Sequence, residues 1–335
     1  MPDDWFNRLL GMLVIIASFV LAWFLMDYHD FTRSHLKLPD RTVTYQLKPG
    51  SSINSIARQF KQNGWISNST YLKICARLNH ISAIKAGEYE FDDSMTPLQL
   101  LEKMSRGEVL LHQVTFIEGW TFKQMLQALQ QNAVLDKTLE GKTQAEIMQL
   151  LGEADMHPEG LFLPDTYAFS RGMSDLQILQ AARQAMRTRL EQAWLKRAEN
   201  LPLKSPYEAL ILASIVEKET GLASERPLIA GVFTSRLRKG MKLQTDPTVI
   251  YGMGDAYKGN IRRKDLLKDT AYNTYVHTGL TPTPISMPGH DAIDAVLHPD
   301  VQGYLYFVAK GDGSHYFSRT LEEHNKAVRK FQLKK

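Results

Sequence analysis

The sequence contains almost no cysteine: Cys75 is the single one among 335 residues. One cysteine can form neither an internal disulfide nor a cysteine-based zinc cluster, whatever the redox compartment. An excess of one charge is also lacking, because 40 Lys and Arg face 36 Asp and Glu, for a net charge of +4. Charges so balanced and interspersed exclude a dedicated nucleic-acid-binding protein and leave only a weak preference for an acidic polymer.

Motifs of several enzyme classes are missing as well. The ten histidines are scattered without an H-E-x-x-H pair, so we expect neither a metal nor any other cofactor. No G-x-S-x-G sequence marks a serine hydrolase. Gly311–Ser314 lies between two expected strands and is a turn rather than a phosphate loop. What remains, with 44% hydrophobic and 23% charged residues, is a chain long enough for two folded domains.

An apolar run stands close to the N-terminus. Leu9 to Met26 carries no charge, and as a helix it rises about 27 Å, close to the hydrocarbon thickness of about 30 Å. It ends in aromatic residues instead of a small-x-small cleavage site, which favours an uncleaved membrane anchor over residues 9–27. The positive charges do not fix its orientation, because Arg8 precedes the run while Arg33 and Lys37 follow it.

A linker and a small unit are expected next. Residues 28–41 are polar and read as a linker, and residues 42–107 as a small unit. Its pattern predicts a strand, two helices, a closing strand and a further helix, over residues 42–47, 53–62, 70–78, 85–91 and from Thr96 to Gly107. Ser51 or Ser52 is expected to cap the first of these helices. Strand order and the Pro-Gly-Ser-Ser turn resemble a LysM-type sugar-binding module, although a generic packing domain fits equally well.

Residues 108–335 are expected to form a larger α+β domain. A strand over 109–117 precedes a helix that begins near Phe122. Strands over 304–310 and 315–318 predict a hairpin, followed by a helix that Thr320 and Glu323 cap. The fold class predicted for the whole chain is therefore α+β, with an N-terminal transmembrane helix, a small LysM-like module and a larger catalytic domain.

The stretch from Tyr207 to Gly221 is the most informative for chemistry. On a helix, Leu212, Ile215 and Val216 form one apolar stripe, and Glu219 falls within that stripe. Glu217 points the other way, to a face expected to be solvated. Apolar surroundings and the negative end of the helix dipole both raise the pKa of a carboxyl, which suits Glu219 to donate a proton to a leaving oxygen. The alternative is a structural pairing of Glu219 with Arg226 or Arg236.

Motifs in matching order resemble the endolytic murein transglycosylase family (MltG/YceG). They are ASIVEKET (213–220), Ser-Glu-Arg (224–226), Arg-Leu (236–237), LQTDPTVIYG (243–252), AYNTY (271–275), Thr-Gly-Leu (278–280), His-Asn (324–325) and Pro-Asp-Thr (164–166). With the LysM-like module, the resemblance covers about residues 42–330 in addition to the anchor. By the resemblance, Glu219 matches the family's catalytic glutamate, and Glu217 is its neighbour in the motif.

The resemblance implies a lyase that cuts the β-1,4 bond between N-acetylmuramic acid and N-acetylglucosamine within nascent glycan strands. The cut leaves a 1,6-anhydro end and terminates elongation. It further implies a single-pass protein of the bacterial inner membrane, with residues 1–8 in the cytoplasm and the catalytic domain in the periplasm. The expected partners are peptidoglycan glycan strands and murein synthase complexes.

Other candidate site residues surround the glutamate in these motifs. Asp246 is the leading second carboxylate, although an Asp before proline also commonly forms a turn. Aromatic and amide side chains suit a carbohydrate groove, and the candidates are Gln244, Tyr251, Tyr272, Asn273, Tyr275 and Asn325. Two other functions stay open: a murein hydrolase with Asp246 as its base, and a membrane-tethered scaffold in which the LysM-like module alone binds murein.

Overall fold

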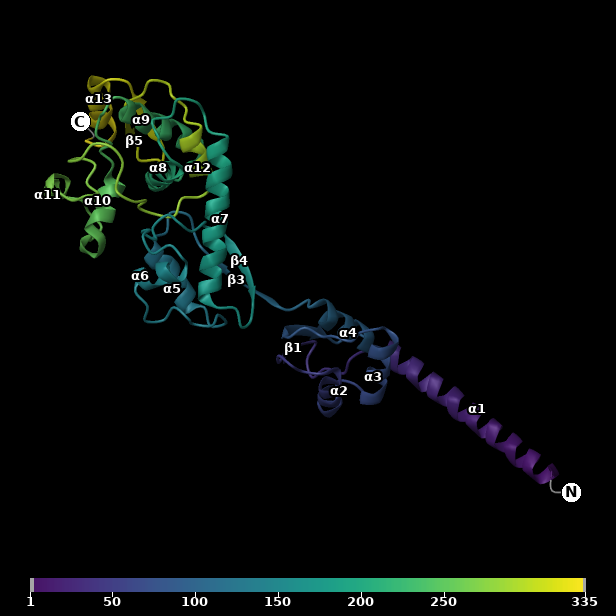
Figure 1. The fold of residues 1–335 in the computed structure, drawn as a ribbon. Coiled ribbons are helices and arrows are strands. Elements are labelled where there is room, and N and C mark those ends of the chain that lie inside the picture. The colour runs from purple at the N-terminus through teal and green to yellow at the C-terminus, as the bar shows by residue number, and fades with distance from the viewer. Residues whose placement is uncertain (1–2, 334–335) are drawn as a thin grey trace. The chain divides into compact units, whose positions relative to one another are not determined.

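The computed structural model describes residues 3–333 and divides the chain into two compact units (Figure 1). The first unit comprises Met1–His112 with Phe169–Gly172, and the second comprises Gln113–Ala168 with Met173–Lys335. Strand β3 (Leu111–Thr115) pairs with β4 (Thr166–Ser170). Helices and small two-stranded sheets make up both units, so the predicted α+β class is confirmed.

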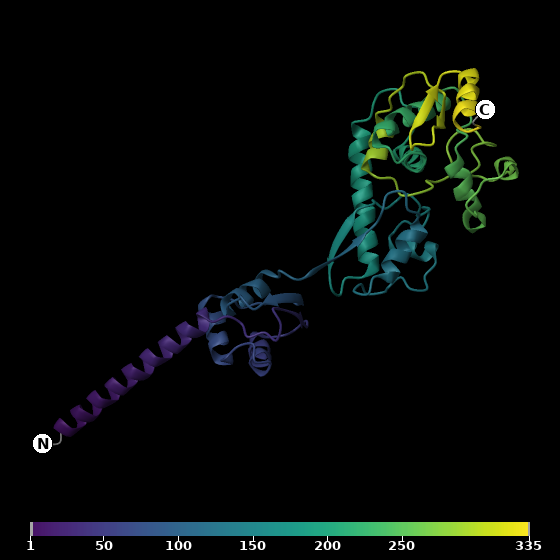
Figure 2. The ribbon, with the colours of Figure 1, turned by 180° about the vertical axis from the view of Figure 1, so that it is seen from behind.

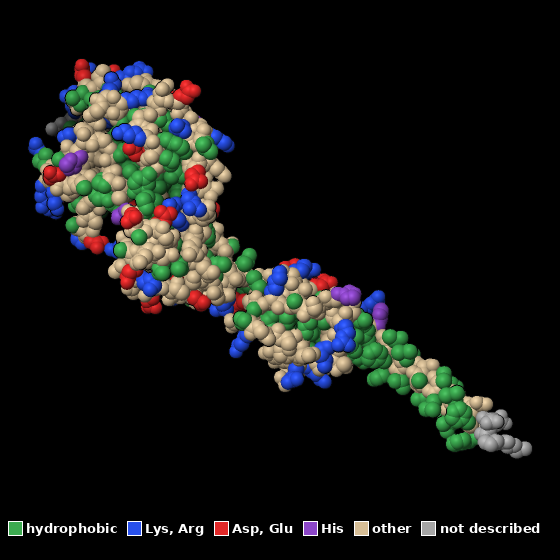
Figure 3. Space-filling view, viewed as in Figure 1, with side chains coloured by type: hydrophobic (Ala, Val, Ile, Leu, Met, Phe, Trp, Pro, Cys, Tyr) green, Lys and Arg blue, Asp and Glu red, His purple; other side chains and the backbone are tan. Residues whose placement is uncertain are grey.

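The N-terminal helix α1 runs from Asp3 to Arg33. Its apolar side chains are exposed along most of its length (Figure 3), and Trp5–Arg33 is long and apolar enough to cross a membrane. The helix extends past the apolar run, so the expected linker is helical in its first residues. Phe31 explains this extension, because it is buried in the first unit and holds the last turn of α1 there.

The rest of the first unit follows the expected order of strand, helix, helix and strand. Its elements are β1 (Thr42–Leu47), α2 (Ile53–Gln62), α3 (Ser69–Leu78), β2 (Gly87–Asp92) and α4 (Pro97–Arg106). The two strands pair antiparallel, with Tyr45 opposite Tyr89. Ser52 caps α2, and Thr96 caps α4, which ends at the left-handed Gly107. These boundaries lie within two residues of the predicted ones.

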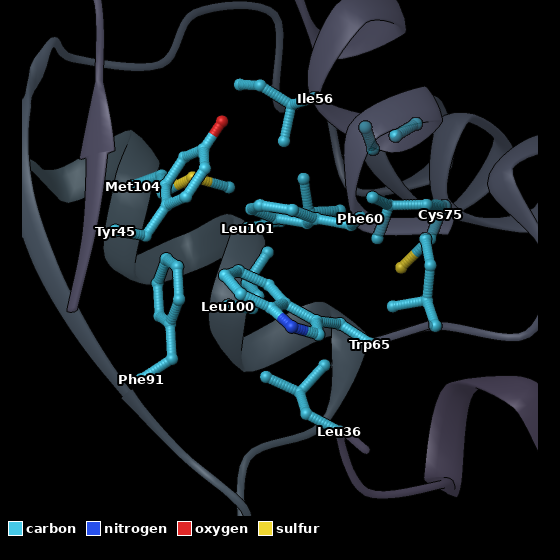
Figure 4. Packing of buried hydrophobic residues seen from close by; sticks show 14 of the residues in the cluster. Leu36, Tyr45, Ile56, Phe60, Trp65, Cys75, Phe91, Leu100, Leu101 and Met104 are labelled. Atoms are coloured by element: carbon cyan, nitrogen blue, oxygen red, sulfur yellow. The ribbon is translucent and has the colours of Figure 1, made fainter. Parts of the chain in front are cut away.

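Aromatic packing forms the core of the first unit (Figure 4). Tyr45, Phe60, Trp65 and Phe91 meet mainly edge to face, which favours aromatic pairs beyond their burial. Cys75 is buried in the same core as a free thiol.

Helix α1 packs directly on α3. The Tyr71 ring lies against the edges of Phe24, Tyr28 and Phe31, and its hydroxyl donates to Asp27 Oδ2 at 2.7 Å. The end of the apolar helix and the small unit therefore form one packed body.

The second unit is mainly helical. Its helices are α5 (Phe122–Gln131), α6 (Gln144–Leu150), α7 (Asp175–Leu195), α8 (Pro206–Glu219), α9 (Arg226–Arg238), α10 (Asp246–Met253), α11 (Arg263–Leu267), α12 (His290–Leu297) and α13 (Leu321–Phe331). The predicted hairpin is present as β5 (Tyr306–Ala309) and β6 (His315–Ser318), beside α13 (Figure 2). Thr320 and Glu323 cap α13 reciprocally, as predicted.

Helix α8 is central to the second unit. It contacts α7, α9, α10 and α12, and Ala209–Val216 are all buried. A helix that is apolar nearly all round is expected inside a core. Ser205 caps its start and it ends at Glu219, so the helix delivers that carboxyl to the edge of the core.

Candidate active site

A cavity of about 510 Å³ opens where α8 ends. It is lined by the end of α8, the start of α10, the β5–β6 hairpin and α13. Among the residues predicted for the site, the cavity collects Glu219, Gln244, Asp246, Tyr275 and Asn325.

Glu219 is partly exposed to this cavity and accepts a hydrogen bond from the Thr245 hydroxyl. The pKa of Glu219 is about 7, because burial and, to a smaller extent, the nearby charge of Asp246 raise it against the lowering effect of the Thr245 hydrogen bond. A large share of this carboxyl is therefore protonated at neutral pH. Neither candidate partner neutralises it, because Arg226 pairs with Glu217 and Asp291 while Arg236 donates to carbonyl oxygens.

Asp246 is the first residue of α10 and faces the same cavity. Its Oδ1 accepts a hydrogen bond of 2.6 Å from the Tyr275 hydroxyl. Burial and this carboxylate together raise the pKa of Tyr275, so the phenol stays protonated. Asp246 thus begins a helix, as an Asp before proline does, and also presents a negative charge next to Glu219.

Gln244 has a backbone conformation that is uncommon for its residue type. Its φ is +51°, in the left-handed region, and its backbone N–H donates to the Thr274 carbonyl at 3.1 Å. The buried Arg236 guanidinium donates to Gln244 Oε1 at 3.1 Å and to the Leu243 carbonyl at 3.1 Å. Such strain persists where the surroundings over-determine it, and it clusters at functional sites.

Two of these residues were not singled out as site residues from the sequence. Thr245 lies between Gln244 and Asp246, but its bond to Glu219 joins positions 26 residues apart. The sequence indicates Arg236 only as an ion-pair partner, although the side chain lines the cavity and donates to Gln244 Oε1. The signal in the sequence that could have indicated a site role for Thr245 and Arg236 is that both lie within the motifs of the resemblance.

The prediction of a solvated face for Glu217 is wrong. Its side chain is only 5% exposed, and it accepts from Gly289 N at 3.0 Å and from Arg226 at 3.3 Å. The segment before α12 covers this face, since the buried Ser214 on the same side accepts from Ile285 N. The Glu118 side chain packs directly on Gly289, where a Cβ would lie 1.8 Å from Glu118 Oε1.

The remaining predicted residues lie outside the first cavity. Tyr251 and Tyr272 line a second cavity of about 770 Å³ in the same unit. Asn273 is buried, and its side-chain amide donates to the carbonyls of Leu266 and Lys268 at 3.1 and 2.7 Å. Asn273 therefore shapes the loop before Tyr275.

No group of three His, Cys, Asp or Glu side chains suited to a metal ion occurs within residues 3–333. The chemistry available in the first cavity is that of carboxyl, hydroxyl, amide and guanidinium groups. A protonated carboxyl beside an acidic side chain and hydrogen-bonding groups can exchange a proton with a bound molecule and stabilise positive charge on it.

Comparison with known proteins places this arrangement in a family. The model of the YceG-like family matches residues 45–330. The endolytic murein transglycosylase of Bacillus subtilis (strain 168) is 32% identical over 308 residues, which cover 87% of this chain and 85% of that protein. The endolytic murein transglycosylase of Streptococcus pneumoniae (strain D39) is 28% identical over 320 residues, and the match covers 85% of this chain and 58% of that protein.

A solved structure supports the same assignment. The crystal structure of a YceG-like protein from Listeria monocytogenes matches with a TM-score of 0.51 and 32% identity, and the match covers 85% of this chain and 98% of that one. The chain belongs to the YceG-like family.

Proposed function

We propose that the chain is an endolytic murein transglycosylase. It cleaves the β-1,4 bond between N-acetylmuramic acid and N-acetylglucosamine inside glycan strands and leaves 1,6-anhydro ends. The observation that carries the proposal is the Glu219 carboxyl, which opens to a cavity, has a pKa of about 7 and has no cation as partner among residues 3–333. Curated relatives with this activity, similar over most of the chain, support the same function.

Glu219 acts first as an acid and then as a base. Its proton passes to the glycosidic oxygen, the bond to the anomeric carbon breaks, and an oxocarbenium-like centre forms on the muramic acid. The carboxylate then takes the proton of that sugar's 6-hydroxyl while the oxygen bonds to the anomeric carbon. One carboxyl suffices, because the nucleophile belongs to the substrate, whereas glycoside hydrolases usually need two.

The neighbouring side chains bind and orient the sugar. Asp246, with Tyr275 donating to it, places negative charge near the developing positive centre. Gln244, held by Arg236, and Asn325 of α13 offer amide groups to the strand. Thr245 orients the Glu219 carboxyl.

Helix α1 anchors the chain in the inner membrane through residues 9–27, with residues 1–8 cytoplasmic and the second unit, the catalytic domain, in the periplasm. Its exposed apolar surface and length support this part of the proposal. Residues 42–107 of the first unit form a LysM-like module, as their order of strand, helix, helix and strand suggests. Murein synthase complexes supply the nascent strands.

Mass spectrometry of the released ends tests the function. The full chain in detergent is incubated with purified glycan strands beside Glu219→Gln. Anhydromuramyl ends from the wild-type chain alone support the lyase with Glu219 as its acid and base. Reducing ends would instead indicate a hydrolase and direct attention to Asp246. Binding without any cleavage would favour the scaffold.

A further inference from the structure

The second cavity adjoins the first through shared elements. Consecutive residues line different cavities: Glu219 lines the first and Lys218 the second, and Asp246 lines the first and Pro247 the second. The last turn of α8 and the first turn of α10 therefore stand between the two spaces. A polymer that crosses this wall can occupy both cavities at once.

A buried carboxyl lies in the wall of the second cavity. Glu159 is 4% exposed, and its two oxygens accept from Phe122 N at 2.9 Å and from the Tyr251 hydroxyl at 3.1 Å. The loop that carries it is pressed against Pro284, since Gly160 has φ +79° and a Cβ there would lie 2.4 Å from the proline ring. The carboxyl is thus held in place from the loop, from α5 and from α10.

Burial raises the pKa of Glu159 to about 7, and the charge of Lys218 opposes burial with a smaller effect. Near neutral pH this group is protonated in a large share of molecules, and a protonated carboxyl can donate a hydrogen bond as well as accept one. The first cavity alone accounts for the cleavage, so the mechanism leaves this group unused.

Aromatic rings flank the carboxyl. Tyr251 and Tyr272 meet edge to face with ring centroids 4.9 Å apart, and the Tyr272 hydroxyl bonds to Thr283 Oγ1 at 2.8 Å. Tyr257 and Ile250 add further apolar surface. A concave site of mostly apolar walls with a few fixed polar groups is typical of small-ligand recognition, and a sugar ring presents both an apolar face and hydroxyls.

We propose that the second cavity binds an N-acetylhexosamine unit of the glycan strand, at a distance from the bond that Glu219 cleaves, with Glu159 and Tyr251 as its polar contacts. This rests on the proposed function only for the identity of the strand. Binding energy gained at a remote unit holds the strand across the cut, which an enzyme acting inside a polymer needs.

Filling the cavity tests the proposal. In the full chain with Glu219→Gln, Ile250→Trp places an indole in the second cavity, while Leu195→Trp adds the same ring at a position that is 81% exposed on α7. Titration calorimetry with peptide-free glycan strands is expected to show affinity about tenfold weaker for Ile250→Trp and unchanged for Leu195→Trp, with equal Tm values. Unchanged affinity for Ile250→Trp would overturn the proposal.

A second variant keeps the test decisive if Ile250→Trp fails to fold. Glu159→Gln keeps one acceptor and one donor at every pH, so strand affinity of Glu219→Gln is expected to fall above about pH 7 and that of the double variant to stay level. The charged and titratable groups that also face this cavity are shared by both proteins: His157, Lys218, Tyr251, Tyr257, Tyr272, and Lys123 with Asp255. Parallel pH profiles would mean that Glu159 only caps α5.

The outcome is independent of the cleavage reaction, because both binding experiments use a variant that cannot cleave. Loss of affinity in Ile250→Trp together with a wild-type chain that produces no anhydro ends would keep the second site and reject the proposed function. Anhydro ends together with unchanged affinity in Ile250→Trp would do the reverse.

Discussion

Glu217 and Glu219 lie two residues apart at the end of one helix, yet their side chains have different surroundings. Glu217 is enclosed, with Arg226 and the Gly289 amide as partners. Glu219 meets a hydroxyl and opens to a cavity. Burial raises the pKa of both, and that of Glu219 reaches about 7. The same residue type is thus enclosed by polar partners on one face of α8 and open to a cavity on the other.

The largest expected difference between the two glutamates is in turnover. Glu219→Gln should lower kcat about a thousandfold, because no proton remains to transfer, whereas Glu217→Gln should lower it less than about tenfold. Release of anhydromuramyl ends by the full chain in detergent measures both. Losses of equal size would contradict the predicted difference between the two glutamates.

Without the Arg226 guanidinium, the buried Glu217 carboxylate is expected to destabilise the fold instead of stabilising it. Arg226→Met is expected to reduce the free energy of unfolding by about 3 kcal/mol at pH 8, because a carboxylate buried beside it loses its counter-charge. The loss should shrink at pH 5, where Glu217 binds a proton more readily. Denaturant unfolding measures it, and Lys326→Met is the control, since its pair with Glu322 on α13 is exposed and contributes little.

The Glu219 carboxyl should lower the free energy of unfolding at alkaline pH. The pKa of Glu219 is about 7 in the folded chain against 4.5 for an ordinary glutamate, so the folded state binds more protons between these values and stability falls as pH rises through them. Glu219→Gln should therefore be more stable than the wild-type chain by about 1–3 kcal/mol at pH 8. Denaturant unfolding at pH 4.5 should show no such gain, and a gain of equal size there would contradict the assignment.

The smallest expected effect concerns Thr245. Its hydrogen bond lowers the pKa of Glu219, so Thr245→Val should raise that pKa and shift the alkaline fall of kcat, near pH 7 in the wild-type chain, upward by about half a unit to one unit. Thr248→Val removes a neighbouring hydroxyl that donates to the Thr245 carbonyl, and should leave the fall in place. A pH–rate profile of each variant distinguishes the two.

Local signals in the sequence predicted much of this structure. Caps at Thr96 and Thr320, the left-handed Gly107 and the hairpin turn at 311–314 all act within a few residues, so their elements were expected correctly. The apolar stripe of α8 likewise placed Glu219 against the core. The motifs around Glu219 are enough to indicate the family, which the comparisons confirm.

Contacts between distant segments could not be predicted in this way. Glu217 is enclosed because residues about 70 positions later cover it, and helical spacing carries no information about such a cover. Tyr251 and Tyr272 have the residue types expected of a groove, but their cavity is separate from that of Glu219. The sequence pattern thus predicted residues that line cavities, but not which of them line the same cavity.

The packing of Tyr71 among Phe24, Tyr28 and Phe31 couples the apolar helix rigidly to the first unit, so the two rotate together. When α1 spans a bilayer, turning the helix about its long axis carries the first unit around with it. One residue inserted in the span before Phe24 would lift that unit by only about 1.5 Å but rotate it by about 100° relative to the start of the helix. The number of residues in the anchor therefore sets the rotational orientation of the first unit about the helix axis as well as its distance from the start of the helix.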